Sequence, residues 1–128
     1  MIRNPAEFER AKPAGYDGLF CWDFLKGAFG PKIEPMDFDG VVERRGHFLV
    51  FETKRDSVEM SLGSEITFAA LLKSPRWTVI LCEKHPDDIQ GWTVWTRAGQ
   101  QHYRGDSRAL YEWCAQWFRS VSADRAAG

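Results

Sequence analysis

The chain has 128 residues, of which 44% are hydrophobic, 14% aromatic and 27% charged, and its formal net charge is -1. This composition predicts one globular domain over residues 1–128, with a polar arm at 1–15 and a frayed tail at 122–128. This net charge excludes an overall positive electrostatic field that would attract nucleic acid. The start of the chain lacks an apolar signal core and no run reaches membrane-spanning length, so we expect a cytoplasmic protein without a membrane partner.

The cysteines Cys21, Cys82 and Cys114 are odd in number and lack CxxC spacing. This pattern disfavours a disulfide framework and a zinc site. Each lies among apolar residues, which predicts buried free thiols in a reducing compartment.

The first expected element is an amphipathic helix over residues 16–29, where apolar residues recur near helical spacing. Gly30-Pro31 would end it. Asp23 is an acid on this apolar helix. It is either a solvated or capping residue, or an additional acid beside a metal site.

Two strands follow, over residues 36–44 and 47–54. The intervening Arg45-Gly46 is a two-residue turn in which the glycine supplies a positive φ. This turn pairs Arg44 with His47. Counting outward, Asp39 then opposes Glu52 and Asp37 opposes Lys54.

Opposed residues, and residues two apart along a strand, share one face of a sheet. Three carboxylates and one ammonium would therefore lie together, and Thr53 would point into the core. Carboxylates are ligands for Mg²⁺, which can activate water against a phosphodiester. A lysine beside them can orient the water, help to deprotonate it or neutralise charge on phosphorus. The alternative is an exposed face with cross-strand ion pairs, such as Asp37 with Lys54.

The hairpin leads into a predicted crossover connection. After a loop at 55–63, Ser64 would cap a helix from Glu65 to Lys73. The run from Trp77 to Cys82 is apolar and β-branched, as in a strand buried on both faces. Strand, helix and strand in this order predict that the new strand is parallel to the one carrying Glu52.

The rest of the chain predicts a half-buried strand over 92–97, a turn at Ala98-Gly99, an edge strand over 101–104 and a helix over 108–121. Asp106 or Ser107 would cap this helix. Trp92 and Trp95 are three positions apart, so they would lie on different faces. The fold class is α/β.

The Asp-Gly strand followed by Glu-x-Lys resembles the PD-(D/E)xK nuclease superfamily, over about residues 16–83. The resemblance implies a restriction-endonuclease-like αβββαβ core with a mixed sheet, here followed by a C-terminal helix. It assigns the motif aspartate to Asp39, with Asp37 as competitor, and the motif's glutamate and lysine to Glu52 and Lys54. Asp23 corresponds to the acid that many members carry on the first helix. Many members carry a glutamine at the start of the helix after the Glu-x-Lys motif, where this chain has Ser64 and Glu65.

The expected function is that of a metal-dependent DNA endonuclease using Mg²⁺, with Mn²⁺ as a substitute. The alternative is a catalytically degenerate inhibitor or accessory subunit of the same fold. A homodimer or protein partner would help so small a chain to hold a duplex. The candidate phosphate-contacting residues are Arg44, Arg45, Arg55 and Lys73.

Overall fold

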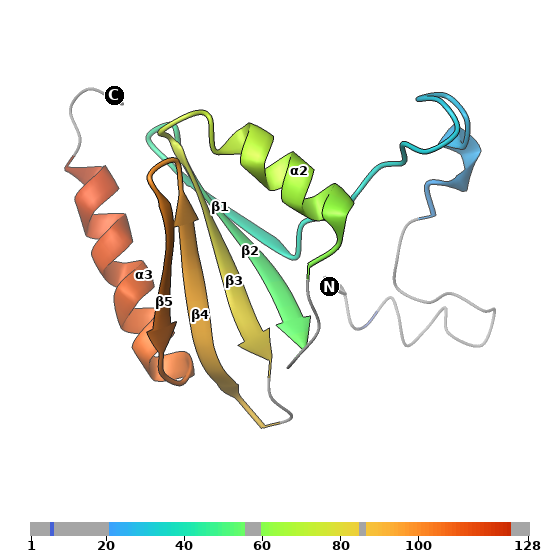
Figure 1. The fold of residues 1–128 in the computed structure, drawn as a ribbon. Helices are drawn as coiled ribbons and strands as arrows, with labels where there is room; N and C mark the ends of the chain where they lie inside the picture. The colour runs from blue at the N-terminus through green and yellow to red at the C-terminus, as the bar shows by residue number, and fades with distance from the viewer. Residues whose placement is uncertain (1–5, 7–20, 56–59, 85–86, 124–128) are drawn as a thin grey trace. The chain divides into compact units, whose positions relative to one another are not determined.

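The computed structural model describes residue 6 and residues 21–55, 60–84 and 87–123 (Figure 1). The side chains of Lys54 and Arg55 lie outside the described part. The chain divides into two compact units, residues 1–37 and 38–128. Each unit is described by itself.

In the first unit the predicted helix over 16–29 is wrong for its described part, 21–29, which holds only a 3-10 turn, η2 (Asp23–Leu25). Gly27 and Gly30 adopt φ values of 87° and 89°, a left-handed conformation that interrupts a helix. Cys21 is exposed, so the prediction of a buried thiol is wrong at this position.

The described part of the second unit is an α/β structure with a five-stranded mixed sheet in the order β1-β2-β3-β4-β5 (Figure 1). β2 and β3 are parallel, and the other neighbours are antiparallel. The strands are β1 (Gly40–Arg44), β2 (His47–Arg55), β3 (Trp77–Lys84), β4 (Ile89–Thr96) and β5 (Gly99–Arg104). The helices are α2 (Leu62–Leu71) and α3 (Ser107–Ser122). Among the described residues, no helix has the length and apolar character needed to cross a membrane.

The crossover from β2 to β3 confirms the predicted parallel pair. α2 begins near the carboxyl end of β2 and runs back along the sheet toward the end where β3 begins (Figure 1). β3 is buried over its central residues, 79–82, as its unbroken apolar run predicts. The first turn of α2 therefore lies toward the carboxyl end of β2, which carries Glu52.

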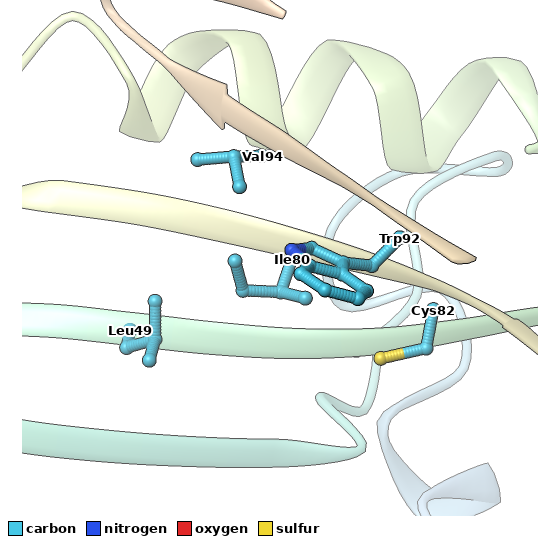
Figure 2. Packing of buried hydrophobic residues seen from close by; sticks show 5 residues of the cluster. All are labelled: Leu49, Ile80, Cys82, Trp92 and Val94. Carbon is cyan, nitrogen blue, oxygen red and sulfur yellow. The ribbon is translucent and has the colours of Figure 1, made fainter. Parts of the chain in front are cut away.

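Two apolar clusters cover the two faces of the sheet. One contains Leu49, Ile80, Cys82, Trp92 and Val94 (Figure 2), and residues of α3 pack against it. The other consists of Val50, Phe68, Leu72, Val79 and Leu81, and thus joins α2 to the opposite face. Trp95 packs against this second cluster, so the prediction that Trp92 and Trp95 lie on different faces is confirmed.

The helix caps correct one prediction and confirm another. Ser61, rather than Ser64, is the N-cap of α2, and its hydroxyl oxygen accepts a hydrogen bond from the Ser64 N–H at 3.2 Å. The helix therefore starts three residues before the predicted Glu65. Asp106 caps α3, and its carboxylate accepts from the Ala109 N–H at 3.0 Å.

Candidate functional site

The hairpin register is the one that the turn chemistry predicts. Arg45 and Gly46 have φ values of 52° and 80°, as a type I′ turn requires. The Gly46 N–H also donates to the Glu43 carboxylate at 2.7 Å. The ladder runs from the pair Arg44–His47 to the pair Gly40–Phe51. The next residues outward are Asp39, which precedes β1, and Glu52 of β2.

Asp39 differs from the prediction because it precedes β1 and lies in a bend. Its Oδ2 atom accepts two hydrogen bonds from Thr53, from the backbone N–H at 2.8 Å and from the hydroxyl at 2.9 Å. Thr53 is exposed, so its predicted burial in the core is wrong. The carboxylate closes the open end of the hairpin and binds Thr53, which alternates onto the sheet face opposite to Glu52.

Glu52 lies two residues after the buried Val50 in β2, and so shares the sheet face covered by α2. It is half-buried, and its Oε2 atom is shielded from solvent. Leu81 and Glu83 of β3 lie in register with Glu52 and Lys54. A carboxylate so poorly hydrated gains more from a nearby cation than one in bulk water does.

The structure does not place three of the predicted residues relative to Asp39 and Glu52. Lys54 belongs to β2, but its side chain lies outside the described part. Asp37 and Asp23 are exposed residues of the first unit. Over the residues that the structure describes, no three His, Cys, Asp or Glu side chains gather as a metal site would need.

Ser64 and Glu65 lie in the first turn of α2. The hydroxyl groups of Ser61 and Ser64 are 3.0 Å apart, so Ser64 takes part in capping the helix. Glu65 is exposed, and its negative charge suits the positive end of the helix dipole. The presence of both residues is therefore explained by their contribution to the stability of α2.

The basic residues are spread over the second unit. The Arg44 Nε–H donates to the Ser122 hydroxyl at 3.0 Å, and its guanidinium lies 5.2 Å from the centre of the Phe118 ring. This links β1 to α3. Arg45 lies in the turn, whereas Glu52 is five residues beyond the start of β2, about 16 Å away along the strand. The Arg55 side chain lies outside the described part, and Lys73 is exposed after α2.

A polar pair across β4 was not expected from the sequence. His102 Nε2 and Glu83 Oε1 are 2.5 Å apart, although they belong to β5 and β3, which are not neighbours. Gly91 of β4 lies between them. A Cβ atom there would be 3.2 Å from Glu83 Oε2 and 3.3 Å from His102 Nε2. A glycine inside a strand often marks such a close approach. Gly91 was therefore the feature of the sequence that could have indicated this pair.

Electrostatics link Asp39 to the core. The pKa of the Cys82 thiol is raised to about 11, first by burial, then by Cys114 and by the negative charge of Asp39. Burial also raises the pKa of Cys114. Both thiols stay protonated at neutral pH, which disfavours them as thiolate ligands or nucleophiles.

Comparison with known proteins gives no assignment. No protein-family model, curated protein or solved structure matches the chain.

Proposed function

We propose that the chain is a metal-dependent nuclease that hydrolyses DNA phosphodiester bonds, with a restriction-endonuclease-like arrangement of its sheet. The observation that carries the proposal is the hairpin register, because Asp39 and Glu52 lie next to its last pair, Gly40–Phe51. The parallel β2–α2–β3 connection that follows is consistent with the proposed fold.

The donor set fits a hard divalent cation. Mg²⁺ is held by one or two carboxylates together with waters and phosphate oxygens. Thr53 occupies Oδ2 of Asp39, and a carboxylate retains acceptor capacity at its second oxygen. Glu52 would supply the second carboxylate. Because Thr53 and Glu52 alternate to opposite faces of the sheet, the Asp39 carboxylate would have to turn toward Glu52 for both acids to hold one cation.

Hydrolysis needs an attacking water and neutralisation of the charge that develops on phosphorus. Bound Mg²⁺ would lower the pKa of water and offset that charge. Asp39 and Glu52 would hold the cation against a non-bridging phosphate oxygen. Lys54 would orient the water or help to remove its proton. As the new P–O bond forms, the ester P–O bond breaks and the leaving oxygen takes up a proton.

The test compares the parent with Glu52→Gln and Lys54→Gln on plasmid, linear and branched DNA in Mg²⁺ or Mn²⁺. Glu112→Gln is the matched control, because Glu112 is an exposed glutamate on α3. We expect cleavage by the parent and the control, and a loss of at least about 100-fold in the two site variants. Calorimetry should show metal binding that depends on Glu52.

The outcomes separate the proposal from its alternative. Absence of both cleavage and metal binding at millimolar metal would refute the nuclease proposal. DNA binding without cleavage in either metal would instead favour a degenerate nuclease-fold binding protein. Cleavage that persists in Glu52→Gln would point to different catalytic residues or to a contaminant.

A further inference from the structure

A small hollow lies between the end of α2 and the turn that joins β4 to β5. Its volume is about 290 Å³, close to the lower limit of roughly 300 Å³ for ligand pockets. The described residues that line it are Ala69, Leu72, Lys73, Trp95, Thr96 and Arg97. They combine an aromatic ring, two cations and an apolar wall, and none of these six is acidic.

The aromatic wall is held in place by the core. Trp95 is half-buried and pairs with Val79 in the sheet. Its ring meets Phe68 edge-on, with centroids 6.4 Å apart and planes at 78°. Phe68 is fully buried. A ligand that packs against Trp95 therefore meets a surface that is already ordered, which lowers the entropic cost of binding.

The two cations approach the hollow from different elements. Lys73 follows α2, and Arg97 lies in the turn after β4, where the Thr96 hydroxyl accepts the Ala98 N–H at 3.2 Å. A lysine after a helix also offsets the helix dipole, which explains Lys73 but not Arg97.

We propose that this hollow binds one nucleotide unit, with its phosphate between Lys73 and Arg97 and its base against Trp95. Arginine and lysine contact phosphates, and bases stack on aromatic side chains regardless of sequence. The apolar wall of Ala69 and Leu72 suits a planar base and offers nothing to a simple inorganic anion. The assignment of the unit to a DNA strand rests on the proposed function, whereas a free nucleotide would have the same chemistry.

The hollow is separate from the candidate metal site. Val79 pairs with Val50 on one side and with Trp95 on the other, so β4 lies two strand spacings from β2. With Glu52 two residues beyond Val50, the backbones of Glu52 and Trp95 are about 12 Å apart on the same face. The hollow would therefore hold a nucleotide other than the one being cut.

The test measures binding of a short labelled single-stranded oligonucleotide by fluorescence anisotropy, in EDTA so that cleavage cannot interfere. The variants are Lys73→Gln/Arg97→Gln, Trp95→Leu and Trp95→Phe. The control Lys84→Gln/Arg108→Gln removes two exposed cations elsewhere. Urea unfolding of every variant shows whether a loss of affinity reflects a loss of folding.

We expect the Lys73/Arg97 double variant to bind more weakly and to reduce the salt slope of the logarithm of affinity by about 0.7, the value for one phosphate of a single strand. Trp95→Leu should weaken binding by about five- to 100-fold, and Trp95→Phe by less. The control should retain parental affinity. Equal losses in the control, or an unchanged salt slope, would overturn the proposal.

Competition identifies the source of the ligand. Adenosine monophosphate should compete with the oligonucleotide far better than inorganic phosphate, and equal competition by the two would overturn the nucleotide assignment. Binding of the monophosphate without the oligonucleotide would identify a free nucleotide as ligand. Loss of cleavage in Glu52→Gln bears only on the nuclease step, because the anisotropy assay in EDTA measures binding without cleavage. Cleavage without a contribution from Lys73, Arg97 and Trp95 would refute only the hollow.

Discussion

Asp39 is expected to stabilise the fold independently of any metal. Its Oδ2 atom accepts both hydrogen bonds from Thr53, at 2.8 and 2.9 Å, where the β1–β2 ladder ends. Asp39→Ala removes both acceptors and leaves the end of the hairpin open. Thr53→Val keeps the backbone N–H and removes only the hydroxyl donor.

The magnitude follows from these two contacts. A hydrogen bond to a charged group contributes about 1.5–3 kcal/mol, and partial exposure to water reduces that to about 1 kcal/mol for each bond here. Asp39→Ala should therefore lower the free energy of unfolding by about 2 kcal/mol, and Asp39→Asn or Thr53→Val by about 1 kcal/mol. In the Asp39→Ala background, Thr53→Val should cost almost nothing, which gives a coupling of about 1 kcal/mol.

Urea unfolding followed by tryptophan fluorescence measures these values, with Asp87→Ala as a control at an exposed acid. The control should change the free energy of unfolding by less than about 0.5 kcal/mol. An unchanged stability in Asp39→Ala, or additive effects of the two substitutions, would refute the hydrogen-bonded closure of the hairpin. Asp39→Asn should also abolish metal binding while most molecules remain folded, so that loss of activity cannot be ascribed to unfolding.

Three further predictions concern the rest of the second unit and the thiols. Gly91→Ala should destabilise the chain by about 1–3 kcal/mol in urea unfolding, because its Cβ would lie 2.8 Å from the Tyr103 carbonyl oxygen, which is backbone; an unchanged midpoint would contradict this. With Ellman's reagent at pH 8, the exposed Cys21 should react fast and the buried Cys82 slowly, since a pKa of about 11 leaves about 0.1% thiolate; equally fast reaction of both would be inconsistent with the fold. The pKa of Asp88 is lowered, first by the Ile89 N–H and then by Ser107, so its folded pKa lies below its unfolded one. Its contribution is complete above the unfolded value and is lost as pH falls through the folded value. The stability difference between the parent and Asp88→Asn should therefore shrink as pH falls below about 4, and a difference independent of pH would contradict this.

The sequence predicts the hairpin and the crossover well because local rules determine both. A glycine in a two-residue turn specifies the register, and the apolar run in β3 specifies burial on both faces. The start of α2 was misplaced by three residues because two serines, Ser61 and Ser64, compete as caps. Both serines suit an N-cap position, and no local rule decides between them.

The candidate site is harder to predict because its contacts join strands that are distant in sequence. Strand alternation predicts that Asp39 faces Glu52, but the chain bends before β1 and its carboxylate binds Thr53 instead. The pair of Glu83 and His102 needs the order of three strands, which Gly91 alone does not reveal. Helical spacing also failed in residues 21–29, where Gly27 with positive φ, followed by Gly30, overrides the apolar pattern.

The bend at Asp39 changes how the candidate metal site should be understood. In a continuous strand, alternation would place the Asp39 side chain on the same face as Glu52. Here its Oδ2 atom binds Thr53, whose side chain alternates onto the opposite face of the sheet. For Asp39 and Glu52 to hold one cation, the Asp39 carboxylate would have to turn away from Thr53, and the two hydrogen bonds oppose that movement. Thr53, which no motif would single out, therefore competes with the cation for Asp39 in the proposed nuclease.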